Sequence, residues 1–388
     1  MGLYRMAQVA IPISPAHKAK SAYVHIPFCT VRCGYCDFNT YINDFGPGAS
    51  RGNYHQSVLR EIEMSKRCIE GKFRTVFFGG GTPTLLDAKS LAEILHALPV
   101  ATDAEVTIEA NPETVTAQSL KDLASAGFTR VSVGMQSAVP KVLATLDRQH
   151  RPERLPVVAQ WVRDAGLDFS VDLIYGTPGE TLEDWKTSLE HALSLEPDHM
   201  SAYSLIVEPG TKLHAQVARG ILPQPDPDEA ADKYLLTDQV LSEAGFAWYE
   251  ISNFARALPG EDHLDASKRR FASRHNLAYW RDWDWWGYGP GAHSHVGDTR
   301  WWNVKHPLAY AQRVRDEEIP MHEGEKLSVE DRELERLMLS IRTCEGVQAP
   351  MRPELEGLVT ENDGRLILTV QGRLMADYVT RVLAGWEG

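Results

Sequence analysis

The sequence contains no run of about 18 consecutive apolar residues, which excludes a helix that spans a bilayer. Glycine and proline are not in excess, so collagen-like and low-complexity chains are also excluded. Apolar residues make up 43% of the chain and charged residues 24%, which is typical of a soluble globular protein. A length of 388 residues favours two or three domains with sizeable hydrophobic cores.

The chain has fewer basic residues than acidic residues. Forty Lys and Arg stand against 53 Asp and Glu, which gives a formal net charge of −13 at pH 7. Such a chain repels polyanions unless a local basic patch overrides the overall charge. We therefore expect no nucleic-acid partner.

Cysteine is also scarce, and its distribution is uneven. Three of the five cysteines, Cys29, Cys33 and Cys36, fall within eight residues. The apolar stretch before them is interrupted by Pro12 and Pro15 and is too short for the core of a signal peptide. A cytoplasmic protein whose clustered cysteines bind a metal is therefore a better interpretation than a disulfide framework.

Strand-like and helix-like segments alternate along the first half of the chain. The strand candidates are residues 21–26, 75–78, 105–110, 130–134, 169–175 and 199–205. The helix candidates between them are residues 53–68, 87–98, 155–166 and 181–195. This alternation predicts an α/β fold with a partial (β/α)6 barrel, whose chemistry would lie at the C-terminal ends of the strands.

The second half of the chain changes character. A Pro-rich segment at 222–230 precedes a helix, and an Asp363-Gly364 pair between alternating apolar residues predicts a β-hairpin near the end. We expect four parts: an N-terminal extension, the barrel, a helical and Trp-rich connecting region, and a winged-helix-like α+β domain. Their ranges are 1–20, 21–222, 223–310 and 311–388. The last part carries as much acid as base, so we expect it to cover the barrel rather than to bind DNA.

The cysteines have the spacing CxxxCxxC, which presents three thiolates from one short loop. A closed structural zinc site needs four ligands, and Cys68 or His25 could supply the fourth. On a 4Fe-4S cluster, three protein thiolates leave one iron atom open for a small molecule. The spacing alone leaves zinc, a cluster and free buried thiols as alternatives.

The residues around the cysteines narrow this choice. The segment YVHIPFCTVRCGYC, with Tyr23, His25, Pro27 and Tyr35, resembles radical S-adenosylmethionine (SAM) proteins of the anaerobic coproporphyrinogen-III oxidase-like family. The resemblance implies that Cys29, Cys33 and Cys36 hold the cluster and that SAM chelates the open iron. It also implies contacts to SAM from Tyr23 and Tyr35.

The same resemblance extends to later motifs. FFGGGTPTLL at 77–86 matches the family's GGGTPT motif, which implies SAM contacts from three of its residues. Polar residues at the ends of later strands are implied to surround SAM as well, although each could instead be a cap or an interior hydrogen-bonding group. The implied residues are Gly80, Gly81, Thr82, Glu109, Gln136, Arg148 and Asp172.

Three features separate the two branches of this family. Phe38 stands where the oxidases have a fourth cysteine, only 22 residues precede Tyr23, and SRHNLAYW at 273–280 matches the HNxxYW motif of the heme-chaperone branch. The resemblance is therefore to HemW-type heme chaperones, and it covers nearly the whole chain from Tyr23.

The HNxxYW motif is implied to contact heme. An imidazole is the usual axial ligand of heme iron, and nearby tryptophans offer flat surface to a macrocycle. The implied heme contacts are His275, Asn276, Tyr279 and Trp280, with His293 and His295 as alternative ligands. A hydrogen-bonded histidine and a packed Trp cluster are the structural alternative.

The expected function is that of a heme chaperone that binds a 4Fe-4S cluster, SAM and heme and transfers heme to acceptor hemoproteins. The resemblance also implies a low-potential electron donor such as flavodoxin or ferredoxin. The alternatives are an oxygen-independent coproporphyrinogen III oxidase and another radical SAM enzyme that modifies tetrapyrroles.

Overall fold

The computed structural model describes residues 19–386. The expected N-terminal extension, 1–20, lies almost entirely outside the described residues. No helix among the described residues combines the length and the apolar character needed to cross a membrane.

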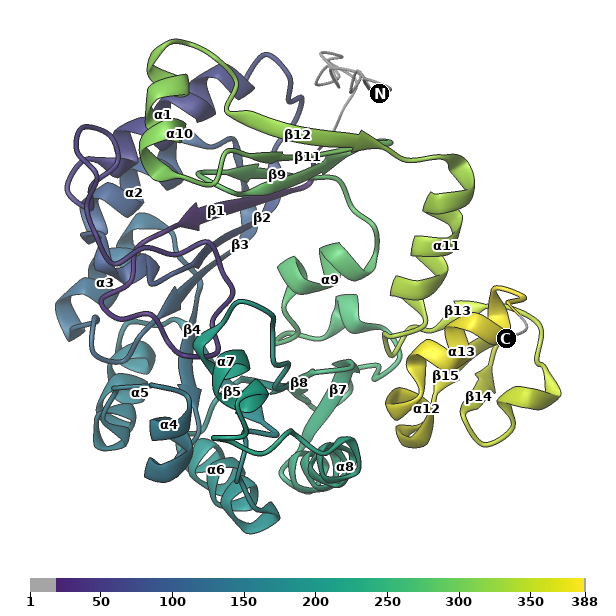
Figure 1. Ribbon diagram of the computed structural model, residues 1–388. Coiled ribbons are helices and arrows are strands. Elements are labelled where there is room, and N and C mark those ends of the chain that lie inside the picture. Colours follow the sequence, from purple (N-terminus) through teal and green to yellow (C-terminus); the bar gives the residue numbers. More distant parts are fainter. Residues whose placement is uncertain (1–18, 387–388) are drawn as a thin grey trace.

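One large curved sheet of 12 strands forms the body of the protein (Figure 1). Its strand order is β12-β11-β10-β9-β1-β2-β3-β4-β5-β6-β8-β7. The strands are β1 Ser21–Ile26, β2 Phe73–Gly80, β3 Val100–Ala110, β4 Arg130–Gln136, β5 Asp168–Tyr175, β6 His199–Ser204, β7 Phe246–Glu250, β8 Asn253–Arg256, β9 Trp285–Tyr288, β10 His293–Val296, β11 Thr299–Asn303 and β12 Met321–Lys326.

The first six strands pair in parallel in chain order, as the sequence predicts. Helices connect them on the outer face of the sheet (Figure 1). The helices up to β7 are α1 Tyr54–Ser65, α2 Ala88–Ala97, α3 Ala117–Ala126, α4 Pro140–Thr145, α5 Leu155–Asp164, α6 Leu182–Ser194, α7 Lys212–Ala218 and α8 Pro227–Glu243, with 3-10 turns η1 Pro83–Leu85 and η2 Pro152–Arg154. The partial α/β barrel is therefore confirmed.

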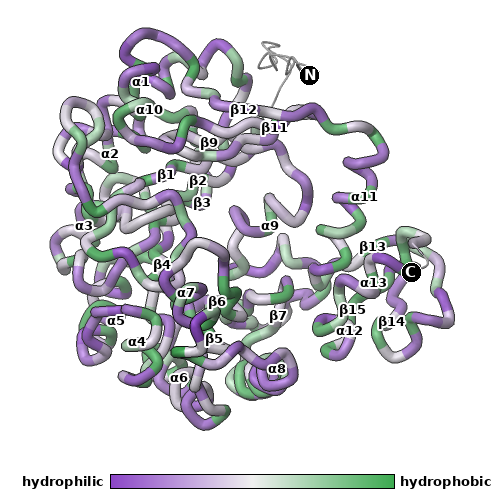
Figure 2. Tube along the Cα trace, in the orientation of Figure 1, coloured by the Kyte–Doolittle hydropathy of each residue, from purple (hydrophilic) through white to green (hydrophobic). Residues whose placement is uncertain are grey.

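Local sequence explains where these helices begin. Thr116 before α3 and Thr181 before α6 form capping boxes with residues three positions later. Asp226 before α8 accepts hydrogen bonds from the backbone amides of the first turn of that helix. Figure 2 shows hydrophobic and hydrophilic residues alternating along these helices, as expected where one face of a helix packs on the sheet.

The sheet continues beyond the six predicted strands on both sides. β9 adds in parallel to β1, and β10 to β12 follow it in antiparallel pairing. On the other side β8 and β7 extend the sheet from β6. α9 Arg274–Trp280 contacts β2, and the remaining elements before the C-terminal unit are η3 Ala266–Lys268 and α10 Pro307–Arg315.

The C-terminal unit begins later than the sequence predicts. The expected boundary at 310/311 falls inside α10, and β12 still belongs to the large sheet. After α11 Val329–Ser340 comes a separate three-stranded sheet in the order β13-β15-β14, whose Asp363-Gly364 hairpin is confirmed. Its elements are β13 Val347–Gln348, η4 Pro353–Leu355, β14 Val359–Asn362, β15 Arg365–Leu368, α12 Val370–Leu374 and α13 Ala376–Leu383. The winged-helix description of this unit stays a prediction.

Candidate functional site

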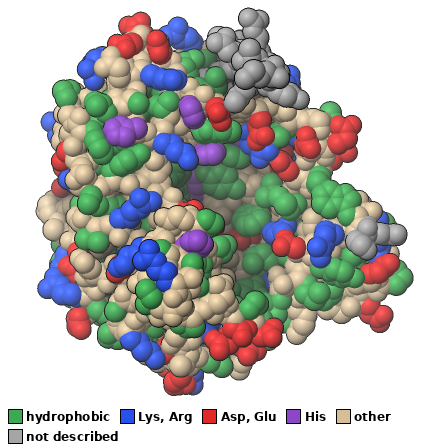
Figure 3. Space-filling view, in the orientation of Figure 1, with side chains coloured by type: hydrophobic (Ala, Val, Ile, Leu, Met, Phe, Trp, Pro, Cys, Tyr) green, Lys and Arg blue, Asp and Glu red, His purple; other side chains and the backbone are tan. Residues whose placement is uncertain are grey.

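A cavity of about 620 Å³ lies inside the curve of the sheet. Every second residue of a strand faces the same side, and β3 to β6 turn polar side chains into this space. Figure 3 shows the molecule hollowed on this face, with hydrophobic side chains around the hollow. A volume of this size falls in the range of small-molecule and cofactor sites.

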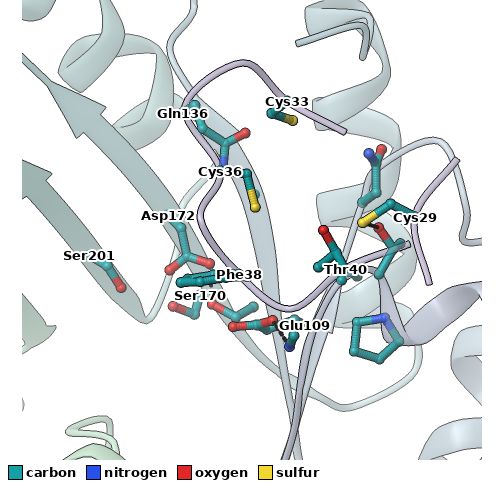
Figure 4. Close-up of a pocket in the computed structure, with 18 of the residues that line it drawn as sticks. Cys29, Cys33, Cys36, Phe38, Thr40, Glu109, Gln136, Ser170, Asp172 and Ser201 are labelled. Carbon is teal, nitrogen blue, oxygen red and sulfur yellow. Dashed lines mark hydrogen bonds between the residues drawn. The ribbon is translucent and has the colours of Figure 1, made fainter. Parts of the chain in front are cut away.

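The loop that follows β1 brings the three cysteines to the cavity. Cys29, Cys33 and Cys36 all line it and none forms a disulfide. Figure 4 shows them on a loop that faces Glu109 and Asp172 on the neighbouring strands. The donor set is three thiols from one loop at the C-terminal end of the barrel, which fits the protein side of an open 4Fe-4S cluster.

Backbone hydrogen bonds hold this loop in place. The amide of Gly34, between the second and third cysteines, donates to the Leu146 carbonyl, and the Gly34 carbonyl accepts from the Leu213 amide. Arg148 donates to the backbone of Gly134 at 2.9 Å and places Nη1 3.8 Å from the Cys33 sulfur. These contacts attach the loop that carries the thiols to neighbouring segments of the barrel.

Burial makes two of the thiols weak acids. It raises the pKa of the Cys29 thiol to about 11 and also raises the pKa of Cys36. Because iron binds the thiolate, loading the site must release protons.

Neither of the two other suggested ligands reaches the cysteines. The His25 ring accepts a hydrogen bond from the Tyr23 hydroxyl at Nδ1 and donates from Nε2 to the Asn39 carbonyl. Cys68 lies at the end of α1 beside Trp286 and Trp301, away from the cavity. A fourth ligand from His25 or Cys68 was therefore a wrong alternative.

The glycine-rich turn after β2 packs against the cysteine loop. Gly80 has φ of +114°, and its amide donates to Glu109 Oε2 at 3.1 Å. A Cβ on Gly81 would lie 2.4 Å from the Phe28 carbonyl oxygen, so only glycine allows this approach. Gly80, Gly81 and Thr82 all line the cavity, as expected of SAM contacts.

The four polar residues at the strand ends also meet at the cavity. Glu109, Gln136, Arg148 and Asp172 line it, as do Tyr23 and Tyr35. Gln136 has a positive φ of 57° at a bulge of β4, which is a strained conformation for a non-glycine residue. Its Oε1 is buried without a partner among the described residues, so it is free to accept a hydrogen bond from a ligand.

Two carboxyl groups in this cavity have raised pKa values. Burial, followed by the nearby Asp172 carboxylate, raises the pKa of Glu109 to about 8. Burial also raises the pKa of Asp172, which accepts a hydrogen bond from the Ser132 hydroxyl at 2.8 Å. A cationic ligand placed between them would be stabilised once they ionise.

The raised pKa of Glu109 predicts a pH-dependent stability. Between pH 4.5 and 8 the folded protein binds a proton at Glu109 that the unfolded chain has lost, so stability falls as pH rises through this window. We expect Glu109→Gln to stabilise the ligand-free protein at pH 8 by on the order of 2 kcal/mol and to leave it little changed at pH 4.5. Urea unfolding at several pH values measures this, and an equal effect at all pH values would contradict it.

The HNxxYW residues lie at the other end of the cavity. α9 places His275, Asn276 and Tyr279 against its lining, but Trp280 is not among the lining residues. His275 is buried, its Nδ1 pairs with the Thr75 hydroxyl, and its Nε2 pairs with the Tyr279 hydroxyl at 3.0 Å. Burial lowers the pKa of His275 to about 3, so the ring is neutral.

The Trp cluster packs the sheet rather than lining the cavity. Trp286 on β9 and Trp301 on β11 are buried and meet edge to face at 5.0 Å. The exposed His293 stacks on Trp302, and Nε2 of His295 donates to the Gly297 carbonyl at 3.1 Å. The structure therefore places neither alternative histidine in the cavity.

Phe38 is two residues after the third cysteine of the loop. It lines the cavity and is 58% exposed, so it lies at the opening.

Comparison with known proteins identifies relatives of the whole chain. The profile of the radical SAM superfamily matches residues 23–192. The chain is 42% identical to the heme chaperone HemW of Mycobacterium tuberculosis over 99% of this chain and 100% of that protein. It is 31% identical to HemW of Bacillus subtilis over 94% and 99%.

A solved structure shares the fold. Coproporphyrinogen III oxidase (HemN) from Escherichia coli superposes with a TM-score of 0.80 at 23% identity, over 97% of this chain and 92% of that chain. The cysteine loop, the glycine-rich turn and the full-length relatives lead to one conclusion. The chain belongs to the radical SAM superfamily and, within its coproporphyrinogen-III oxidase-like family, to the HemW branch.

Proposed function

We propose that this protein is a heme chaperone that holds a 4Fe-4S cluster, binds SAM and heme, and transfers heme to acceptor hemoproteins. The observation that carries the proposal is full-length similarity to HemW proteins, together with Phe38 at the opening of the cavity. Acceptor hemoproteins, a flavodoxin or ferredoxin as electron donor, and a cytoplasmic location remain predictions.

The residues of the cavity have separate tasks in this proposal. Cys29, Cys33 and Cys36 hold the cluster, which supplies one-electron chemistry and an open iron for SAM. Glu109 and Asp172 balance the positive charge of SAM, and the glycine-rich turn brings backbone groups close to it.

The test of the proposal is binding and transfer of heme. Anaerobically reconstituted protein should bind about one heme per chain and pass it to an apo-hemoprotein, measured by absorption spectra after separation of the two proteins. Formation of protoporphyrinogen from coproporphyrinogen under reducing conditions with SAM would instead establish the oxidase. A lack of stoichiometric heme binding would refute the chaperone.

The HNxxYW motif gives a more specific prediction. A neutral imidazole can bind iron once the Tyr279 hydroxyl gives up its bond to His275 Nε2. We expect His275→Ala to weaken heme binding by about tenfold or more and to leave the iron and sulfide of the cluster unchanged. His293→Ala is the matched control, because that exposed ring lies outside the cavity lining. Equal loss of heme and cluster in His275→Ala would show a folding role instead.

A further inference from the structure

The cavity is lined by a buried arginine that the SAM motifs do not include. Arg130 begins β4, is 2% exposed and lines the cavity. The strand register places Thr107 of β3 directly beside it. We call the part of the cavity lined by Thr107, Arg130, Ser170, His199 and Asn276 the floor.

The guanidinium of Arg130 has unused hydrogen-bond donors. Nη2 donates to the Phe271 carbonyl at 2.9 Å. Nε and Nη1 are buried and have no partner among residues 19–386, and the Thr107 hydroxyl beside them has none either. Leaving charged donors buried without partners is costly, so such groups are expected to meet a ligand or water.

The nearest carboxylate does not satisfy these donors. Glu105 Oε2 lies 3.7 Å from Arg130 Nη2, which is too far for a hydrogen bond. The Glu105 carboxylate instead accepts from the backbone amides of Arg274 and His275 and from the Ser273 hydroxyl, at the start of α9. Glu105 offsets part of the positive charge but leaves Nε and Nη1 free.

The other floor residues are neutral or hydrogen-bonded elsewhere. The His199 ring pairs with the Ser170 hydroxyl at 2.8 Å and with the Tyr249 hydroxyl at 2.8 Å. Burial, together with the charge of Arg130, lowers the pKa of His199, so it adds no positive charge. The floor thus presents a single cation whose planar fork of donors matches a carboxylate.

We infer that the floor is a binding site for a carboxylate group of a ligand, held by Nε and Nη1 of Arg130 with the Thr107 hydroxyl beside it. This inference rests on the proposed function for the choice of ligands. Gln136 at the other end of β4 is six positions after Arg130, which corresponds to about 20 Å of strand. In the proposed function, a SAM held at the cysteine loop would have its carboxylate at the open iron, so a carboxylate on the floor would come from another group.

Two ligands could supply it, a propionate of heme or the carboxylate of a second SAM. We commit to the shared chemistry, and the experiment separates the two sources. Wild type, Arg130→Met and Arg130→Lys are titrated with heme and with heme dimethyl ester, in which both propionates are masked. SAM bound per chain is measured by equilibrium dialysis on the same cluster-loaded preparations.

The ester preference ratio is the Kd for heme dimethyl ester divided by the Kd for heme. If heme is the source, this ratio should be about ten to a hundred in wild type and should fall toward one in Arg130→Met. Arg130→Lys should retain part of the preference. If SAM is the source, Arg130→Met should bind one SAM fewer per chain with an unchanged ratio.

Arg269→Met is the matched control. That guanidinium is 3% exposed and donates to backbone carbonyls of residues 247, 248 and 255, but it does not line the cavity. It should lose stability without changing the ratio or the SAM count.

The inference would be overturned if Arg130→Met folds and keeps both the wild-type preference for heme over its ester and the wild-type number of SAM molecules per chain. If Arg130→Met does not fold, the inference is tested with wild type and Arg130→Lys. It would be overturned if wild type binds heme and its dimethyl ester equally well and Arg130→Lys binds as many SAM molecules per chain as wild type. A wild-type protein that binds no heme would refute the proposed function alone, because the SAM measurement still tests the floor.

Discussion

Cys33→Ser is expected to leave the protein folded and without its iron–sulfur cluster. Cys33 is half-buried on the loop after β1 and lies outside the apolar core. Serine preserves the backbone bond from the Cys36 amide to the carbonyl of residue 33, but its hydroxyl is a poor substitute for a thiolate toward iron. We expect iron and sulfide to fall below about a tenth of the wild-type content after anaerobic reconstitution.

The fold itself should tolerate this change. Replacement of a half-buried loop side chain typically costs less than about 1 kcal/mol, so the far-ultraviolet circular dichroism and the melting temperature of the ligand-free protein should barely move. Cys68→Ser is the control, because Cys68 is packed in the core away from the cavity. It should lower stability and keep the cluster. Full iron and sulfide in Cys33→Ser would contradict the assignment of the three cysteines.

The parallel part of the sheet could be predicted because it is encoded locally. β1 coincides with the predicted range 21–26, and the four predicted helices agree with α1, α2, α5 and α6 to within a few residues. Strand, helix and strand in succession admit few topologies once the crossover is right-handed. β9 could not be placed in this way, because its partner β1 precedes it by more than 250 residues.

The same distinction applies to the last domain boundary. α10 and β12 look from the sequence like the beginning of a new unit. β12 pairs with β11 of the large sheet and α10 packs against α1, and only these long-range contacts reveal that both belong to the body of the protein. Periodicity reports which face of a segment is buried but not which segment covers it.

Some residues of the site could be predicted from the sequence and others could not. The resemblance predicted that motif residues such as Gly81 and Glu109 share one site. They line one cavity because each lies at or just after the C-terminal end of a parallel strand. Arg130 was missed because it begins its strand, where stability rather than chemistry is the usual interpretation. The signal that could have identified it is a charged residue at the start of a strand that is buried along nearly its whole length.

The tryptophans are residues that the sequence suggested for the site and that do not line the cavity. Their density near the HNxxYW motif suggested flat surface for a macrocycle, yet Trp286 and Trp301 pack between strands of the sheet. Large aromatic side chains are used for packing wherever sheets meet other layers, so their number alone cannot distinguish a core from a binding site.

Gly81→Ala should disable the site while leaving most of the fold intact. Added to Gly81, a Cβ would lie 2.4 Å from the Phe28 carbonyl oxygen and 3.0 Å from the Cys29 sulfur. Neither neighbour can yield easily, because the Thr82 amide donates to that carbonyl at 2.7 Å and the Gly81 amide donates to the Ile26 carbonyl at 2.8 Å. The strain must displace the cysteine loop from the glycine-rich turn.

We expect this displacement to cost about 1–3 kcal/mol in stability and to weaken SAM binding by at least about tenfold, because the loop and the turn form opposite sides of one site. Equilibrium dialysis with SAM and iron analysis on the same samples measure both effects. Gly52→Ala is the matched control, because a Cβ there meets no atom within 4 Å and its backbone φ is not positive. If Gly81→Ala bound SAM as tightly as Gly52→Ala and kept its iron, the close approach of these two segments would not be what shapes the SAM site.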